Sequence, residues 1–195
     1  MSNSARIIID MCGRIKRIAD NLNRLSQPVE LKKTSLCLND VLEDAVQLMT
    51  ETAGRIKRFS SDDPAAPFRL AKECSSDLPR VQADPALLSQ VYVNLILNAA
   101  DAMMEQGHGV LTVGTRLNPE RSEVCGFVED TGCGIPRDLI DKVFQPYFTT
   151  KPQGKGTGLG LAMVRSTIEA HNGRIMLQSA EERGTRVEFY LPLQA

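Results

Sequence analysis

Residues 84–105 read DPALLSQVYVNLILNAADAMME, and this stretch decides the fold. An aspartate accepts hydrogen bonds from the first turn of a helix and a proline fits its first position, so Asp84 and Pro85 predict a helix start. The apolar pattern that follows predicts the longest helix of the chain, from Ala86 to about Glu105. Gly107 ends it.

A polar stripe interrupts this apolar helix at Asn94, Asn98 and Asp101. With about 3.6 residues per turn, the three side chains fall on one face. Two amides and a carboxylate in an apolar helix are costly unless something polar meets them. Their oxygens suit a hard cation such as magnesium, which commonly arrives with phosphates. A stripe that is merely solvated is the alternative interpretation.

Strand patterns rich in Val, Ile, Leu and Phe surround this helix. They predict strands at 110–116, 123–130, 174–179 and 185–191, with a less regular one at 68–73. A helix over 159–171 lies between the strand pair at 110–130 and the strand pair at 174–191, and Asn172-Gly173 ends it. A further helix runs from Val41 to about Met49, with Asn39 as its N-cap. Its predicted buried side holds Val41, Leu42, Ala45, Val46, Leu48 and Met49.

Helices mixed with neighbouring hairpins predict an α+β fold. We expect a two-layer sandwich, in which a mixed, mostly antiparallel sheet is covered by helices on one face. An N-terminal helix of the bundle type precedes it.

This N-terminal helix carries a regular apolar seam. The seam residues alternate in steps of three and four, at Ile8, Met11, Ile15, Ile18, Leu22 and Leu25. Such a seam needs a partner, which is either another helix, as in a homodimer through residues 5–25, or the rest of its own domain. Pro28 ends the helix, so we divide the chain into residues 1–27 and a domain at 28–195.

A second motif, DTGCGIP at 130–136, directly follows the strand at 123–130. Two glycines one residue apart let the backbone turn sharply and let a flat ligand approach closely. An ionised aspartate only accepts hydrogen bonds, so Asp130 would select the amino group of adenine over the carbonyl of guanine. The alternative is a simple glycine-containing turn after a strand.

Two further motifs, FQPYFTTK at 144–151 and GKGTGLGL at 154–161, lead into the helix at 159–171. Glycines before a helix N-terminus leave free backbone N–H groups at the positive end of the helix dipole, and both favour phosphate. Lys151 and Lys155 add positive charge. The spacing is not that of a P-loop, and we expect a mobile lid.

In this order and spacing, the four motifs resemble the N, G1, F and G2 boxes of the ATPase and kinase superfamily that includes gyrase, a heat-shock chaperone, mismatch-repair ATPases and histidine kinases. The similarity covers about residues 84–192 and is specific, because four motifs of different chemistry agree. EAHNGR at 169–174 and Gly184-Thr185 are similar to histidine kinases of the nitrogen-regulator type. The resemblance implies the ATP-binding catalytic domain of a two-component sensor histidine kinase, with ATP and Mg²⁺ as cofactors.

The resemblance also implies roles for individual residues. Asn98 would coordinate magnesium, and Asn94 would orient water or the γ-phosphate. Asp130 would accept from the adenine amino group, and Thr185 would contact the base directly or through water. Asn94 and Lys151 are the implied catalytic residues. The implied nucleotide-binding set is Asn94, Asn98, Asp101, Asp130, Gly132, Gly134, Ile135, Phe148, Thr149, Lys151, Gly156, Thr157, Gly158, Leu159, Gly160, Leu161 and Thr185.

Asn94 also separates subclasses of the superfamily. In the members that hydrolyse ATP with water, a glutamate stands four residues before the metal-binding asparagine and activates the water. An amide is no general base, so Asn94 favours a kinase. A superfamily ATPase, a serine kinase acting on an anti-sigma partner, and a nucleotide-binding interaction module without catalysis are the alternatives.

The chain shows no acceptor histidine. It has only His108 and His171, and neither stands in the sequence context of an acceptor. At a helix C-terminus, the cationic form of His171 would be favoured. The helix at 1–27 is similar to the second helix of the dimerisation hairpin, so we expect a C-terminal piece of a longer kinase. The acceptor helix and a response-regulator receiver domain are the expected partners.

Composition limits other functions. Lys+Arg 23 against Asp+Glu 24 gives a net charge of -1, which argues against nucleic-acid binding. No apolar run reaches the roughly 18 residues of a membrane span, so we expect this chain to be cytoplasmic. This expectation leaves room for a membrane attachment elsewhere in the full-length kinase. The five scattered cysteines are expected to be reduced and mostly small core residues.

Overall fold

The structure is a computed structural model that describes residues 30–52, 58–60, 63–151 and 156–193. The predicted seam helix at 5–25 lies outside the described residues. The elements are β1 (Thr34–Leu36), α2 (Leu38–Thr52), β2 (Phe59–Ser60), β3 (Phe68–Cys74), β4 (Val81–Ala83), α3 (Pro85–Met104), β5 (Gly109–Asn118), η2 (Pro119–Arg121), β6 (Glu123–Asp130), η3 (Arg137–Leu139), α4 (Gly160–Ala170), β7 (Arg174–Ala180) and β8 (Gly184–Pro192). Within the described ranges, no helix combines the length and apolar character that a membrane span needs.

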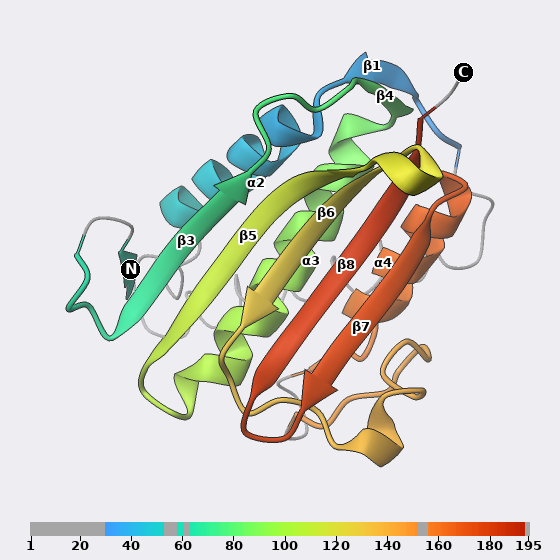
Figure 1. The fold of residues 1–195 in the computed structure, drawn as a ribbon. Coiled ribbons are helices and arrows are strands. Elements are labelled where there is room, and N and C mark those ends of the chain that lie inside the picture. Colours follow the sequence, from blue (N-terminus) through green and yellow to red (C-terminus); the bar gives the residue numbers. More distant parts are fainter. Residues whose placement is uncertain (1–29, 53–57, 61–62, 152–155, 194–195) are drawn as a thin grey trace, which may run out of the picture.

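Six strands form one sheet in the order β2-β3-β5-β6-β8-β7, and β1 pairs with β4 beside it. The β2–β3 and β3–β5 pairs are parallel, whereas β5–β6, β6–β8 and β7–β8 are antiparallel. Helices α2, α3 and α4 cover one face of this sheet (Figure 1). The prediction of a two-layer α+β sandwich with a mixed, mostly antiparallel sheet is confirmed.

Helix α3 lies in the centre of the helical layer and starts where the sequence predicts. Asp84 is its N-cap, and its Oδ1 accepts a hydrogen bond of 3.1 Å from the amide of Leu87. The helix packs against α2, α4 and the central strands. Its buried residues are Leu88, Val91, Tyr92, Leu95, Ile96, Ala99, Ala100 and Met103. The apolar side of α3 is therefore fixed in the core, and its polar stripe is left for another purpose.

Asp84 also ties α3 to two other parts of the chain. Its Oδ2 accepts from the amide of Lys32 at 2.9 Å, and its own amide donates to Nε2 of His171 at 2.9 Å. On the other side of that ring, Nδ1 of His171 lies 2.8 Å from the carbonyl of Thr167. Because Nε2 accepts, Nδ1 carries the proton and donates. Burial lowers the pKa of His171, so the expectation that a helix terminus would favour its cation is wrong.

Helix α2 differs from its prediction in two details. It begins at Leu38, so Asn39 lies within the helix and is not its N-cap. Instead the Asn39 amide donates to the carbonyl of Ser75 at 2.9 Å and its Oδ1 accepts from the hydroxyl of Thr115, which makes it a tertiary contact. Leu48 is 48% exposed although it was expected in the core. With about 3.6 residues per turn, Leu48 lies at the edge of the buried face of α2, which centres on Leu42 and its buried neighbours.

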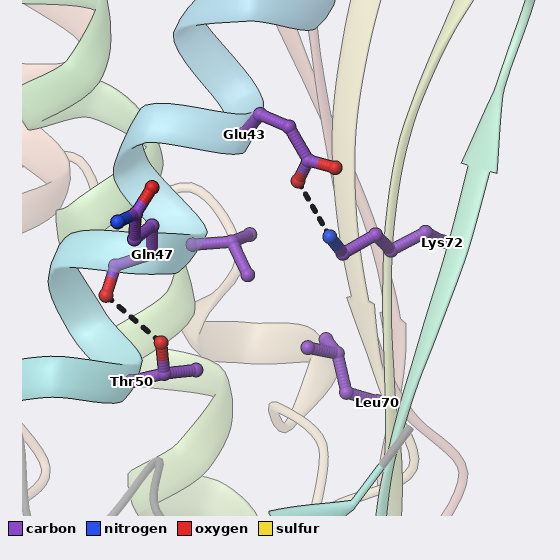
Figure 2. Close-up of a pocket in the computed structure, with 6 residues that line it drawn as sticks. Glu43, Gln47, Thr50, Leu70 and Lys72 are labelled. Carbon is purple, nitrogen blue, oxygen red and sulfur yellow. Dashed lines mark hydrogen bonds and ion pairs between the residues drawn. The ribbon is translucent and has the colours of Figure 1, made fainter. Parts of the chain in front are cut away.

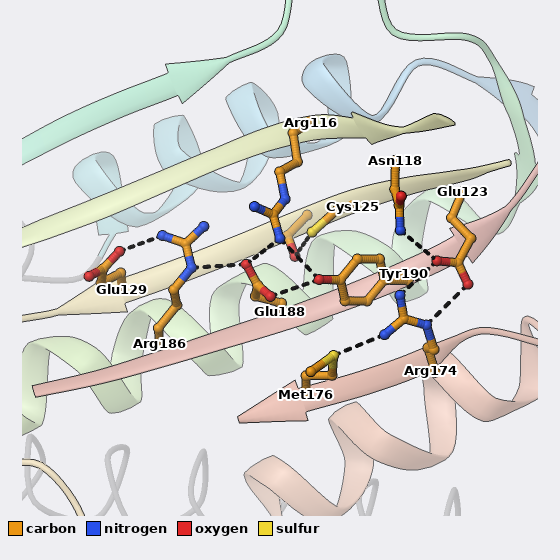
Figure 3. A network of polar contacts seen from close by, with 11 residues as sticks. Arg116, Asn118, Glu123, Cys125, Glu129, Arg174, Met176, Arg186, Glu188 and Tyr190 are labelled. Carbon is orange, nitrogen blue, oxygen red and sulfur yellow. Dashed lines mark hydrogen bonds and ion pairs between the residues drawn. The ribbon is translucent and has the colours of Figure 1, made fainter. Parts of the chain in front are cut away.

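Polar side chains cover the opposite face of the sheet (Figure 3). Glu188 is buried there, and its carboxylate accepts from Arg116 at 2.8 Å, from Arg186 at 2.9 Å and from the Tyr190 hydroxyl at 2.7 Å. Burial opposes the charge, yet these hydrogen bonds and cations lower the pKa of Glu188 overall. The Arg186 guanidinium also stacks 4.0 Å from the ring centroid of Phe127. Arginine side chains thus cover the sheet face opposite α2, α3 and α4.

The cysteines are less buried than expected. Of the four that the structure describes, Cys125 is buried, Cys37 is half-buried, and Cys74 and Cys133 are exposed. All four are free thiols. Cys74 is the last residue of β3, and Cys133 lies in the glycine-containing loop at 130–136.

Candidate nucleotide-binding site

The polar stripe of α3 is half-buried and already in contact with a cation. Nζ of Lys151 lies 2.8 Å from Oδ2 of Asp101 and 3.3 Å from Oδ1 of Asn98. One turn earlier, Oδ1 of Asn94 accepts from Nε2 of Gln90 at 3.3 Å. The stripe is therefore not merely solvated, because a lysine from a loop some fifty residues away in the chain comes to it.

Asp130 ends β6 as a buried carboxylate, with 6% of its surface exposed. Its Oδ1 accepts from the amide of Gly132 at 2.8 Å, and the backbone of Thr185 also donates to it. Burial nevertheless raises the pKa of Asp130 to about 6, against an ordinary value of 3.8. The carboxylate is thus ionised at neutral pH, and two N–H donors do not exhaust its acceptor capacity.

The two glycines of the DTGCGIP loop are needed for close packing. A Cβ on Gly132 would lie 2.7 Å from the backbone of Ala102 on α3. Gly134 has φ +69°, and a Cβ there would lie 1.9 Å from the carbonyl oxygen of Ala180. The amide of Cys133 donates to Ala102 at 3.3 Å. The loop is therefore fixed between the end of α3 and the β7–β8 turn.

Ser179 was not predicted as part of the site, although it holds the loop in place. Its hydroxyl accepts from the amide of Ile135 at 2.8 Å, donates to the carbonyl of Gly184 at 2.9 Å, and lies 2.9 Å from Oγ1 of Thr185. Thr185 pairs with Asp130 across the β6–β8 ladder. A serine inside a strand pattern carries no sequence signal for such a role.

Residues 144–151 and 156–160 return to the same helix, and Lys155 with the rest of 152–155 lies outside the described residues. A Cβ on Gly160 would lie 3.7 Å from Nδ2 of Asn98, so the start of α4 lies against the polar stripe. Gly158 has φ +65° and packs on the backbone of Tyr147, whose amide donates to its carbonyl at 2.8 Å. Gly156 lies against Thr149 in the same way.

The N-terminus of α4 has no side-chain cap. Leu159 occupies the N-cap position without a capping hydrogen bond, and the ladder begins when the amide of Met163 donates to Leu159. The amides of the first turn thus have no acceptor within the helix. Leu159 itself is buried, Leu161 packs on the core, and Phe148 is half-buried beside the exposed Thr149 and Thr157.

These contacts bring three of the predicted segments to α3. The loop that carries Asp130 contacts Ala102, and Gly160 at the start of α4 lies against Asn98 one turn earlier. Lys151 adds a third connection through Asp101. Ser179 connects Ile135 of the loop to Thr185 of β8.

A hollow lies elsewhere, between α2 and β3 (Figure 2). Its lining residues are Glu43, Val46, Gln47, Thr50, Leu70 and Lys72. Lys72 forms an ion pair with Glu43 across it. No predicted site residue lines this hollow, so it is separate from the candidate site.

Neither histidine is placed as a phosphate acceptor. Both ring nitrogens of His171 are engaged inside the core. His108 is exposed, but it lies in the turn between α3 and β5 and not on a helix.

Known proteins resemble this chain in both sequence and fold. A family model described as histidine kinase-, DNA gyrase B-, and HSP90-like ATPase matches residues 83–195. The sensor histidine kinase ZraS of Escherichia coli (strain K12) is 34% identical over 97% of this chain and 37% of its own length. The sensor kinase CckA of Brucella abortus (strain 2308) is 36% identical over 92% of this chain and 19% of its own length.

Solved structures point the same way. The catalytic domain of the histidine kinase ThkA is 30% identical, with a TM-score of 0.65 over 83% of this chain and 95% of that domain. ShkA, solved in complex with AMPPNP, shares the fold with a TM-score of 0.74 at 23% identity, over 92% of this chain and 36% of ShkA.

The chain belongs to the family of histidine kinase-, DNA gyrase B- and HSP90-like ATPases. Within this family, its ATP-binding catalytic domain is of the kind found in sensor histidine kinases, as its sequence predicts. The chain spans only 37% of ZraS and 19% of CckA.

Proposed function

We propose that residues 28–195 bind ATP with Mg²⁺ and transfer the γ-phosphate to a histidine that is not in this chain. The observation that carries the proposal is the meeting of the Asp130 loop, Lys151 and the N-terminus of α4 on one helix. Phosphoryl transfer asks mainly for positioning and charge neutralisation, and this set of groups provides both.

Asp130 is the proposed adenine recogniser. Its carboxylate is buried, ionised at neutral pH and held by Gly132 and Thr185, so it offers a fixed acceptor to an exocyclic amino group. Gly132 and Gly134 let the loop pack closely, Ser179 holds Ile135 of the loop, and Thr185 pairs with Asp130 and is the proposed second contact with the base.

Magnesium fits the donor set on α3. Asn98 Oδ1 and Asp101 Oδ2 already attract a positive charge, that of Lys151, and both are the oxygen ligands that Mg²⁺ prefers. Asn98 would hold the ion, with Asp101 beside it. When bound, the ion supplies charge neutralisation for the phosphates.

The segment around α4 is the proposed phosphate site. Its first-turn amides have no partners within the helix, and the helix dipole favours an anion there. Lys151 adds a mobile positive charge. The residues proposed to surround the triphosphate are Phe148, Thr149, Gly156, Thr157, Gly158, Leu159, Gly160 and Leu161.

Asn94 directs the proposal to a kinase. An amide cannot remove a proton from water, whereas a neutral imidazole attacks a phosphoryl group without a base. Asn94 is proposed to orient the γ-phosphate. The acceptor histidine comes from another helix, because His171 is engaged on both nitrogens and His108 lies in a turn.

Partners follow from the same proposal. We assign residues 1–27 to the second helix of a dimerisation hairpin, and a response-regulator receiver domain to the step after histidine phosphorylation. One related structure supports the latter: histidine kinase ThkA in complex with the response regulator TrrA, at 26% identity and TM-score 0.72, covers 96% of this chain and 50% of that one.

The test is phosphate transfer from radiolabelled ATP to a separately made acceptor hairpin of a related kinase. We expect Mg²⁺-dependent, acid-labile label on the hairpin, and far less of it with Asp130→Ala at the same ATP concentration. Loss of a charged hydrogen bond costs about 1.5–3 kcal/mol, so a fluorescent ATP analogue should bind this variant roughly tenfold to a hundredfold more weakly. Steady ATP hydrolysis without an acceptor, or acid-stable label on a partner, would instead favour an ATPase or a serine kinase.

A further inference from the structure

The ammonium of Lys151 occupies the position where the proposed function needs a different cation. It contacts Asp101 Oδ2 at 2.8 Å and Asn98 Oδ1 at 3.3 Å. We infer that Lys151 is a stand-in cation in the nucleotide-free protein, and that magnesium with nucleotide binds only after this ammonium leaves Asn98. The inference rests on the proposed function and adds a competitor built into the chain.

The two cations exclude one another for a simple reason. A lysine ammonium is a compact charge with three N–H donors, and two of them are directed at the oxygens of α3. Mg²⁺ demands close oxygen ligands in a strict geometry. An ion on Oδ1 of Asn98 would share that oxygen with the ammonium, and the two like charges would repel each other at close range.

The polar stripe explains why a lysine comes to rest there. The side chains of Lys151 and Asp101 are only 34% and 21% exposed. A carboxylate that has lost much of its water is unfavourable without a positive charge beside it. Lys151 therefore supplies a positive charge beside Asp101.

The backbone at Lys151 is anchored, so only its side chain has to move. The amide of Lys151 donates to Oγ1 of Thr149 at 3.2 Å. Gly156 packs against the same turn, where a Cβ would lie 3.2 Å from Cβ of Lys151. After displacement, the ammonium stays within reach of the site and is available to phosphate oxygens. Nucleotide binding is thus an exchange, in which magnesium replaces lysine on Asn98.

The experiment measures how much Mg²⁺ is needed for nucleotide binding. A fluorescent ADP analogue is titrated into the whole chain at a series of Mg²⁺ concentrations, with EDTA as the metal-free reference. ADP is used because it lacks the γ-phosphate, to which a displaced lysine would otherwise add affinity. The variants are Lys151→Met and Lys151→Gln, and Lys72→Met is the matched control, since Lys72 forms its ion pair with Glu43 away from the site.

We expect both Lys151 variants to reach half-maximal ADP binding at an Mg²⁺ concentration about two- to fivefold lower than the parent, as loss of a partly exposed ion pair allows. Lys72→Met should not change it. An unchanged or higher Mg²⁺ requirement in both Lys151 variants overturns the inference. If the parent itself binds no ADP at any Mg²⁺ concentration, the proposed function fails instead.

A second measurement examines the contact without any ligand. Amine-reactive labelling followed by mass spectrometry reports the reactivity of each lysine. In Asp101→Asn, Lys151 should be labelled several times faster than in the parent, while Lys72 keeps its rate. Equal labelling of Lys151 in both proteins would mean that the ion pair does not hold the ammonium in solution, which also overturns the inference.

Discussion

At the scale of single residues, Asp130 combines burial with an incomplete set of hydrogen-bond donors. Two backbone amides reach it, but burial still raises its pKa to about 6. A carboxylate with this pKa changes its charge just below neutral pH. If it accepts a hydrogen bond from adenine, the affinity for adenine must change with pH as this carboxylate is protonated.

We therefore predict that adenosine binds about tenfold more weakly at pH 5 than at pH 8, because protonated Asp130 loses acceptor capacity. Adenosine is preferred to ATP, whose phosphates titrate in the same range. Calorimetric titration across this pH range measures the effect. Asp130→Asn should bind weakly at every pH. A flat profile for the parent would show that another group recognises the base.

His171 carries a pH dependence of stability. Burial lowers its pKa from 6.5, so below that pH the unfolded chain binds a proton at His171 more readily than the folded chain does. The contribution of neutral His171 is full above about pH 6.5 and is lost as the pH falls below it. Asp130 acts in the opposite sense, because its raised pKa favours folding toward acid.

A comparison with His171→Gln separates the two groups. At pH 8 the parent should be more stable by about 1 kcal/mol, the worth of one buried hydrogen bond from Asp84. This difference should shrink between pH 6.5 and pH 5, by at most about 1.4 kcal/mol per pH unit. Urea unfolding at each pH gives the free energies. A constant difference would mean that His171 titrates normally in the folded protein.

At the scale of elements, the DTGCGIP loop is fixed by close backbone contacts. Gly134→Ala places a Cβ against Ala180, whereas Gly107→Ala, also at positive φ, meets nothing within 4 Å. Both variants bear the cost of a left-handed residue, about 1–2 kcal/mol. We predict that only Gly134→Ala also displaces the loop and weakens fluorescent ATP binding, by at least tenfold. Equal affinities in the two variants would contradict a role for this close approach.

The long elements could be predicted from sequence because their signals are local. Asp84-Pro85 and a continuous apolar pattern define α3, and the strands of β5 to β8 carry enough residues for a pattern to show. β1, β2 and β4 have only three, two and three residues, too few for any alternation. The Asn39 prediction was wrong because a good capping residue was used for a contact across the fold.

The site residues divide in the same way, into those with a local sequence signal and those defined by contacts across the fold. Residue types at fixed spacing indicated Asn98, Asp130 and the glycines, since helix periodicity and turn chemistry are local rules. What each of them touches depends on chain pairing, so neither the hold of Ser179 on Ile135 nor the contact of Lys151 with Asp101 could be read from spacing. The resemblance to a known family supplied the roles, and these stay predictions.

At the scale of the whole molecule, the described domain holds every proposed nucleotide-binding residue, and the seam helix at 5–25 lies apart from them in the sequence. We predict that the full chain is a dimer through this seam and that residues 30–195 alone are monomeric. Both should bind ATP with equal affinity. Light scattering after gel filtration gives the masses, and a fluorescent nucleotide gives the affinities.

The control for this prediction is a full chain with Ile15→Asp and Leu22→Asp, which removes two seam residues without shortening the protein. It should behave as the monomer. If all three proteins have the same subunit count, the assignment of residues 1–27 to a dimerisation helix is wrong.

The three hydrogen bonds of Asp84 have a mechanical consequence. This one residue joins three parts of the chain: the segment before β1 at Lys32, the first turn of α3, and the C-terminal end of α4 at His171. We propose that oxygens of α3 and amides of α4 hold the ligand, and the start of α4 lies against Asn98 of α3. A displacement of the chain just ahead of β1 would thus be passed to α3 and to α4 through this one side chain and its backbone amide.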